Sequence, residues 1–281
     1  MLADAPTTPN IDWATPIAAA LERLREARPL VQNITNFVSM DIVANALLAL
    51  GASPAMVHAR EELDDFGAFA SALVVNIGTL SGPWVESMLQ ASAGAHTRGT
   101  PWILDPVGAG ATRFRNDTVT QLMQNRPTIL RGNASEILAV ATALGLGNTA
   151  AKPKGVDSMN TTDEAAEVAV ILARGTGTVV VASGAIDVIT DGRRVTRLAN
   201  GSPLMTQVTA VGCSLSAIAG AFAASTPDAF AAAVAAVAVT GIAGELAARD
   251  TTAPGSFRTA FIDRLATIDT AAIRQTLTVL P

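Results

Sequence analysis

The sequence predicts an α/β fold in which a mostly parallel central sheet carries helices on both faces. Between residues 54 and 182, short apolar runs alternate with longer segments of helical pattern. The apolar runs are continuous, which is typical of parallel strands that are buried on both faces. Hydrophobic residues make up 49% of the 281 residues and charged residues only 15%, which is enough apolar material for a large core.

The expected elements follow one another in a regular order. Residues 1–14 form a flexible polar tail, and an amphipathic helix over residues 16–28 ends at Pro29. Strands are then expected over residues 54–57, 72–77, 102–104, 128–130 and 178–182. Helices are expected over residues 40–50, 84–93, 118–124, 135–143 and 162–173.

The later part of the chain departs from this alternation. Two strand-like pieces within residues 187–198 flank Asp191-Gly192, a dipeptide that favours a tight hairpin turn, so they should add antiparallel strands to the sheet. Residues 212–248 predict a pair of helices that is broken at residues 226–228. No linker, repeat or low-complexity segment divides the sequence, and we expect residues 15–281 to form a single domain.

The composition argues against several classes of partner. With 19 basic and 24 acidic residues the net charge is −5, and aromatic residues, which stack on bases, make up only 4%, so nucleic acid is not expected to bind. The single cysteine, Cys213, excludes an intrachain disulfide framework.

The sequence also predicts the compartment. The N-terminus lacks the basic flank and the apolar run of a secretory signal. Residues 198–227 are uncharged, but Asn, Gly, Pro and Gln interrupt them, and the smoother apolar stretch over residues 229–244 is too short to cross a bilayer. We therefore expect a cytoplasmic protein without a membrane partner.

Polar residues and glycines follow most of the expected strands. In an open parallel sheet, ligands bind beyond the carboxyl ends of the strands. The segments at this edge are residues 76–79, 105–110, 131–136, 183–184 and the turn 209–213. They bring two carboxylates, one arginine, several glycines and the cysteine together, which indicates a functional site.

Neither of two common phosphate-binding motifs is present. The sequence contains no Gly-x-x-x-x-Gly-Lys-Ser/Thr and no strand followed by Gly-x-Gly-x-x-Gly. The best alternative is the start of the helix at Gly212-Cys213, where free N–H groups and the helix dipole favour an anion.

Several motifs in register carry a resemblance to a known family. The longest are residues 104–112 (LDPVGAGAT), 131–137 (RGNASEI) and 212–217 (GCSLSA), with shorter matches at 33–36, 47–56 and 76–80. In these motifs the chain resembles the hydroxyethylthiazole kinases of thiamine salvage, from about residue 15 to the C-terminus. The resemblance implies a ribokinase-like fold and a homotrimer with substrate sites between subunits.

The same resemblance implies the substrates and the residues that bind them. The reaction would transfer phosphate from ATP to the primary alcohol of 5-(2-hydroxyethyl)-4-methylthiazole. The residues implied for the alcohol are Met56, Asn36 and the backbone of Ala210. Those implied for ATP are Arg131, Ser183 and Gly212.

The chemistry would depend on a metal ion and a base. Asp105 and Glu136 would serve a Mg²⁺ ion at the phosphates, since Mg²⁺ prefers oxygen ligands. Cys213 would take the proton of the alcohol as a thiolate, because a helix start lowers the pKa of a thiol. Where the family usually has Gly-Thr-Gly-Cys, this chain has residues 210–213 as Ala-Val-Gly-Cys, which would crowd the substrate. The segment 148–154 is irregular, and its Lys152 and Lys154 are expected in a solvated loop.

Each residue also has a plain structural interpretation. Cys213 could be a small buried side chain, and Met56 could belong to the core. Glu136 lies three residues after Asn133, the spacing of a helix capping box, and both roles could coexist. Asp105, which precedes a proline, could be only a turn residue.

Two other functions remain open at this point. One is a different kinase of the same fold, for hydroxymethylpyrimidine or pyridoxal. The other is a nucleotide-binding protein without kinase activity. An assay of ADP release across a panel of alcohols separates them.

Overall fold

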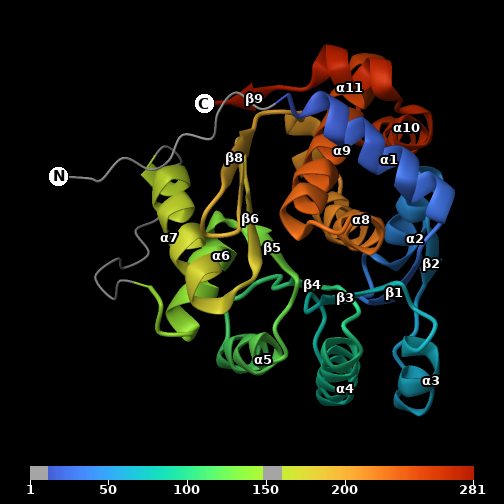
Figure 1. Ribbon diagram of the computed structural model, residues 1–281. Coiled ribbons are helices and arrows are strands. Elements are labelled where there is room, and N and C mark those ends of the chain that lie inside the picture. The colour runs from blue at the N-terminus through green and yellow to red at the C-terminus, as the bar shows by residue number, and fades with distance from the viewer. Residues whose placement is uncertain (1–11, 148–159) are drawn as a thin grey trace.

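A single sheet organises the part of the chain that the computed structural model describes, residues 12–147 and 160–281. Its nine strands lie in the order β2-β1-β3-β4-β5-β6-β7-β8-β9 (Figure 1). Most of the expected tail and the whole segment 148–154, with Lys152 and Lys154, lie outside the described residues.

The first six strands in chain order are parallel, and the last three are antiparallel to their neighbours. The parallel strands are β1 (Leu30–Ile34), β2 (Ser53–Ala55), β3 (Ala72–Asn76), β4 (Trp102–Asp105), β5 (Ile129–Asn133) and β6 (Val179–Ser183). The antiparallel strands are β7 (Asp187–Thr190), β8 (Val195–Leu198) and β9 (Val279–Leu280). The mostly parallel sheet and the hairpin at Asp191-Gly192 are therefore confirmed.

Strand β1 is an element that the sequence pattern did not reveal. Its central residues, Gln32 and Asn33, are polar and interrupt the apolar run, yet both are buried. The side-chain amide of Gln32 donates to the carbonyl of Val57 at 3.2 Å, and that of Asn33 donates to the carbonyl of Val31 at 2.9 Å. These hydrogen bonds reduce the cost of burying the two amide groups, although Oδ1 of Asn33 has no partner among the described residues.

Helices cover both faces of the sheet (Figure 1). One face carries α8 (Val211–Ser225) and α9 (Ala229–Asp250), against which α1 (Ala14–Ala27), α2 (Met40–Leu50), α10 (Pro254–Thr267) and α11 (Thr270–Thr276) pack. The other face carries α4 (Gly82–Arg98), α5 (Arg113–Gln124), α6 (Ala134–Ala143) and α7 (Asn160–Thr176), with the short α3 (Leu63–Gly67) beside α4. Two 3₁₀ turns, η1 (Arg60–Glu62) and η2 (Pro203–Gln207), complete the described elements.

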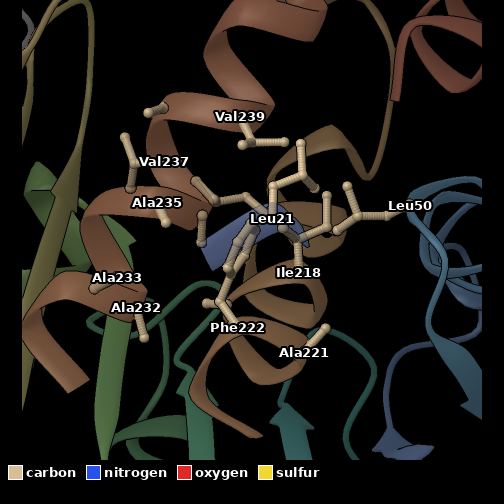
Figure 2. Packing of buried hydrophobic residues seen from close by; sticks show 14 of the residues in the cluster. Leu21, Leu50, Ile218, Ala221, Phe222, Ala232, Ala233, Ala235, Val237 and Val239 are labelled. Carbon is tan, nitrogen blue, oxygen red and sulfur yellow. The ribbon is translucent and has the colours of Figure 1, made fainter. Parts of the chain in front are cut away.

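Small side chains allow α8 to lie very close to the sheet. A Cβ atom on Gly220 would come within 2.8 Å of Cγ2 of Val74 in β3. On its other side α8 packs against α9, where alanines alternate with valines and Phe222 fills the space between the two helices (Figure 2). The excess of alanine in the sequence thus serves close packing of helices on the sheet.

The long apolar helix α9 lies in the core. Among the described residues it is the one helix that has the length and composition to cross a membrane, and 78% of its most apolar window is buried inside the structure. The expected helix pair over residues 212–248 and its break at residues 226–228 are confirmed. Helices α10 and α11 and strand β9, which follow it, had not been predicted.

Candidate active site

The carboxyl ends of the parallel strands surround a cavity of about 380 Å³. The residues that line it lie in or after β1, β3, β4 and β5, or at the starts of α6 and α8, and they include Asn36, Gly78, Asp105, Arg131, Glu136 and Cys213. The edge of the sheet at which the sequence predicted a site therefore does gather these side chains. The volume lies in the range of small-molecule sites.

The structure brings together most of the predicted site residues. Ala210 and Gly212 line the cavity as well, and Ser183 is one hydrogen bond away from it. Met56 is not among the residues that line this cavity, because its side chain packs against the core on the face that carries α8 and α9.

Asp105 is a completely buried carboxylate at the end of β4. Its Oδ2 atom accepts hydrogen bonds at 2.7 Å from the amide of Asn76 and from the hydroxyl of Ser216, while Oδ1 has no partner among the described residues. Burial raises the pKa of Asp105 to about 6, and the nearby charge of Arg131 opposes this shift. These contacts involve elements far from its own turn, so Asp105 is more than a turn residue.

Side-chain amides connect Asp105 to the thiol. Asn36 donates from Nδ2 to the sulfur of Cys213 at 3.4 Å and to Oδ1 of Asn76 at 2.9 Å. Asn76 in turn donates to Asp105. Asn76 lies in a segment that the sequence singled out, but neither it nor Ser216 had been given a role. Both are polar residues within matched motifs, which was the available signal, and the structure shows that both are buried.

The environment of Cys213 contradicts one expectation. Burial raises the pKa of the Cys213 thiol, and the negative charge of Asp105 raises it further. The hydrogen bond from Asn36 and the charge of Arg131 lower this pKa but do not outweigh the two causes. The prediction that the helix start lowers this thiol pKa is therefore wrong, because loss of hydration and a neighbouring carboxylate dominate.

The guanidinium of Arg131 lies at the N-terminal end of helix α8, next to Gly212. Its side chain is 14% exposed, and Nη1 lies 4.0 Å from Oδ2 of Asp105. The Nε atom donates to the hydroxyl of Ser183 at 3.1 Å. A Cβ atom on Gly212 would come within 2.8 Å of Nη1, so a larger residue here would require the guanidinium to shift. A cation thus lies directly at the N-terminal end of a helix.

A second carboxylate lies near Arg131. Burial raises the pKa of Asp187 to about 6, while the backbone N–H of Gly184 and the charge of Arg131 lower it. The N–H of Gly184 donates to Oδ1 of Asp187 at 3.1 Å. Asp187 begins the hairpin, and the sequence gave no reason to place it near the site.

The first turn of α8 presents backbone N–H groups. Ala210 caps the helix in the left-handed conformation, with φ 66° and ψ 12°, which alanine rarely adopts. Its carbonyl accepts from the backbone N–H of Ser214 at 2.9 Å. The N–H groups of residues 211–213 come before the first intrahelical donor, Ser214, and have no acceptor within the helix, so they can bind an anion together with Arg131.

Glu136 forms the capping box that its spacing predicted. Its N–H donates to Oδ1 of Asn133 at 2.9 Å, and its Oε2 accepts the N–H of Asn133 at 2.8 Å. The other carboxylate oxygen, Oε1, accepts the N–H of Gly108 at 2.8 Å. The side chain thus holds both the start of α6 and the loop after β4.

The carboxylate oxygens of Asp105 and Glu136 suit a Mg²⁺ ion that keeps most of its bound water. No group of three or more His, Cys, Asp or Glu side chains within residues 12–147 and 160–281 could hold a metal ion by itself. The buried Oδ1 atom of Asp105 lacks a partner in that same part of the chain, and a cation would supply one. Mg²⁺ is commonly bound by one or two carboxylates together with water and substrate phosphates.

Solved structures with low sequence identity place the fold in a class. The pyridoxal kinase of Staphylococcus aureus, solved in complex with AMP-PCP, gives a TM-score of 0.55 at 14% identity and covers 78% of this chain and 88% of its own. A ribokinase-like superfamily protein of Enterococcus faecalis gives 0.58 at 13%, covering 92% and 90%. The fold is therefore the ribokinase-like α/β fold that the sequence motifs implied.

Closer relatives define the family. The family model described as "Hydroxyethylthiazole kinase family" matches residues 21–271. A hydroxyethylthiazole kinase of Cereibacter sphaeroides is 52% identical over 90% of this chain and 94% of its own, and one of Rhizobium rhizogenes is 51% identical over 90% and 92%. The solved hydroxyethylthiazole kinase protein of Pyrococcus horikoshii OT3 has a TM-score of 0.87 at 42% identity, covering 94% and 98%.

The chain belongs to the hydroxyethylthiazole kinase family. The predictions of the family and of a kinase enzyme are thereby confirmed.

Proposed function

We propose that this enzyme transfers the γ-phosphoryl group of ATP to the primary alcohol of 5-(2-hydroxyethyl)-4-methylthiazole. The observation that carries the proposal is the cavity, in which a helix N-terminus and Arg131 face a buried carboxylate and a thiol. Membership in the family supports the choice of alcohol. Phosphoryl transfer requires mainly positioning and charge stabilisation, and this arrangement is suited to both.

The transferring phosphate would bind at the start of α8. The N–H groups of residues 211–213 donate to its oxygens, and the guanidinium of Arg131 neutralises part of its charge. Ser183 holds Arg131 through Nε, which leaves the Nη atoms directed to the cavity side where Gly212 lies. Ser183 would also contact ATP.

Asp105 and Glu136 would hold Mg²⁺ near these phosphates. The ion supplies charge neutralisation at the phosphate oxygens when bound. Asp105 would bind through its unpaired Oδ1, directly or through water. Glu136 would bind through water, because each of its oxygens already accepts one backbone N–H and has a lone pair left.

Cys213 would accept the proton of the alcohol. The alcohol oxygen forms its bond to phosphorus as the bond from phosphorus to the β-phosphate oxygen breaks, and the proton moves to the Cys213 thiolate. Because the pKa of this thiol is raised, the thiolate is a minor form at neutral pH but a strong base. Asn36 donates to the sulfur and would favour the thiolate.

The proposed assembly is a homotrimer with sites between subunits. Phe37 and Val38 are 68% and 60% exposed beside the cavity, and exposed apolar side chains at a site suit contact with another subunit. Met56 lies outside the cavity of its own chain, and a shared site is the arrangement in which it would contact the alcohol. Light scattering should give three times 28.7 kDa, and a stable monomer would refute this assembly.

We further propose a single domain over residues 15–281 and a cytoplasmic location. The sheet supports a single domain because it includes strands from both ends of the described chain. Membership in the hydroxyethylthiazole kinase family supports the location.

A substrate panel tests the function. Purified protein with MgATP should phosphorylate the hydroxyethylthiazole far faster than hydroxymethylpyrimidine or pyridoxal, measured as ADP release and as phosphorylated product. Equal or reversed preference among the three alcohols would refute the substrate. Absence of ADP release with all of them would favour a nucleotide-binding protein without kinase activity.

A further inference from the structure

Arg115 lies in the first turn of α5 and joins two loops by hydrogen bonds to their carbonyls. Its Nη1 atom donates to the carbonyl of Ile77 at 2.5 Å and to that of Val107 at 2.6 Å. Its Nη2 atom donates to the carbonyl of Gly78 at 2.9 Å. The side chain is half-buried, and its position is set by Thr112, which caps α5 by accepting the N–H of Arg115.

The two loops form different sides of the cavity. Gly78, which follows β3, lines the side where Asn36 and Cys213 lie, and its N–H donates to the Oδ1 atom of Asn76 that also accepts from Asn36. The loop after β4 follows Asp105 and contains Val107, which also lines the cavity.

The second loop is held from its other end as well. The N–H of Gly108 donates to Glu136, so this loop is fixed between Arg115 and the carboxylate at the start of α6. Within the described residues, no bond from α6 to the loop after β3 is observed. The N–H of Ile77 donates to the carbonyl of Asp105 at 3.2 Å where the two strands end. Beyond that point, the guanidinium of Arg115 cross-links the two loops through Gly78 and Val107.

We propose that Arg115 is a positioning residue that fixes the loop after β3, beside the alcohol ligand Asn36, relative to the loop after β4, which follows the proposed Mg²⁺ ligand Asp105. The role rests on the proposed function, since it concerns the distance between the two reacting groups. Such a residue touches neither substrate, but a displacement of about 1 Å between reacting groups can cost about 100-fold in rate. Arginine suits the task because its planar fork reaches several acceptors in fixed directions, which a lysine ammonium does not.

The test compares three variants with the wild type. Arg115→Met removes the cross-link and keeps an apolar stem, and Arg115→Lys keeps the charge without the fork. Arg113→Met is the matched control, because Arg113 lies on the same turn of α5, is 94% exposed and pairs with Asp117 at its surface. The kcat value and both KM values are measured with whichever alcohol the wild type phosphorylates fastest, and kcat is expressed per nucleotide-binding site counted by calorimetric titration with ADP.

Arg115→Met should lower kcat per binding site by about 100-fold and leave both KM values within about threefold of the wild type. Arg115→Lys should recover a small part of the rate, and Arg113→Met should match the wild type. If Arg115→Met does not fold, Arg115→Lys carries the test by the same criteria.

Two results would overturn the positioning role. One is a kcat per binding site close to that of the wild type, which would make Arg115 a stabilising residue only. The other is a loss confined to KM, which would indicate a binding role. A wild type that is inactive on every alcohol would instead refute the proposed function and this role with it, so the two failures are distinguishable.

Discussion

The side-chain amide of Asn36 donates a hydrogen bond to the sulfur of Cys213, at 3.4 Å. The same nitrogen donates to Asn76, which donates to the buried carboxylate of Asp105. The thiol and the carboxylate are therefore oriented by one chain of hydrogen bonds. A change at either end should alter the other through this chain.

The pH dependence of kcat should follow the ionisation of the Cys213 thiol. Because burial raises its pKa, the thiolate becomes more populated as the pH rises, and kcat should increase from neutral into alkaline pH. The Cys213→Asp variant carries a base that is already ionised at neutral pH, so its rate should not show this increase. Steady-state rates measured between neutral and alkaline pH check both expectations.

Removal of the thiol should leave a slow enzyme. Cys213→Ala should lower kcat by about 10²–10⁴-fold, the usual contribution of a general base, with near-normal ATP binding. Cys213→Ser is the matched control, because it keeps the size of the side chain without an acidic proton, and it should be as slow. If Cys213→Ala is as fast as the wild type when chemistry limits the rate, Cys213 serves only packing.

Asp105→Asn should separate stability from activity. Burial raises the folded-state pKa of Asp105 from 3.8 to about 6, so the folded protein retains a proton that the unfolded chain loses between these pH values. Stability therefore falls as the pH rises through this window, by about 3 kcal/mol from this group. The asparagine variant should lack this loss, unfold at higher urea concentration than the wild type at pH 7, and require more Mg²⁺ for a lower rate.

The same comparison in acid is the control for Asp105. Below the unfolded-state pKa, Asp105 is protonated in both states, and the stability advantage of Asp105→Asn should vanish. A variant that is less stable than the wild type at pH 7 would show that the ionised carboxylate stabilises the fold.

Glu136→Gln should affect both the helix cap and the metal. Glutamine has one acceptor oxygen, so it can accept from Gly108 or from Asn133 but not from both as the carboxylate does. We expect a loss of about 1–3 kcal/mol in the free energy of unfolding and a higher Mg²⁺ requirement. Urea unfolding and Mg²⁺ titration of the rate measure the two effects separately.

A cap elsewhere in the chain provides the control for Glu136. Asp269 caps α11 by accepting the N–H of Ala272 at 2.8 Å, outside the residues that line the cavity. Asp269→Ala should cost about 1 kcal/mol and leave the Mg²⁺ requirement unchanged. If Glu136→Gln behaves in the same way as Asp269→Ala, Glu136 is a cap and no metal ligand.

Ala210→Gly should stabilise the protein. Alanine at φ 66° has unfavourable contacts between its Cβ atom and the backbone, which glycine avoids. We expect a gain of about 0.5–1 kcal/mol after the greater freedom of glycine in the unfolded chain is subtracted. Gly99→Ala is the reverse control, because Gly99 has φ 70° and an added Cβ atom would meet nothing within 4 Å, and it should lose about 1 kcal/mol.

The outcome for Ala210→Gly has a clear alternative. Equal stability of Ala210→Gly and the wild type, together with the expected loss in Gly99→Ala, would show that contacts of the Ala210 methyl group compensate the backbone strain. Thermal unfolding of the three proteins under one set of conditions decides between these results.

Most of the sheet and the edge at which the site lies could be predicted from the sequence. Continuous apolar runs such as residues 72–77 identify buried parallel strands directly, and the residues after them must then meet at one edge. Strand β1 could not be found in this way, because Gln32 and Asn33 interrupt its apolar run, and the partner of Gln32, the carbonyl of Val57, comes near only in the folded chain.

The details of the site depended on distances that a sequence does not contain. The raised pKa of Cys213 results from burial and from Asp105, which lies far away along the chain. Arg115 gave no signal at all, since its partners are backbone carbonyls and any residue type could supply them. Met56 was matched by motif, but within its own chain it is partly buried against the core and does not line the cavity.

Because Gly220 and Val74 lie so close together, packing in the interior of the protein contributes to the geometry of the active site. Gly220 lies eight residues after Gly212 on one rigid helix, about 12 Å along its axis. A larger side chain there would lift α8 from the sheet and carry its first turn away from Arg131, which stays with β5. In saturation mutagenesis scored by growth, substitutions by larger residues along the buried side of α8 should therefore impair growth, although these positions lie outside the active-site cavity. Stability engineering that replaces these small core residues by larger ones should therefore lower kcat.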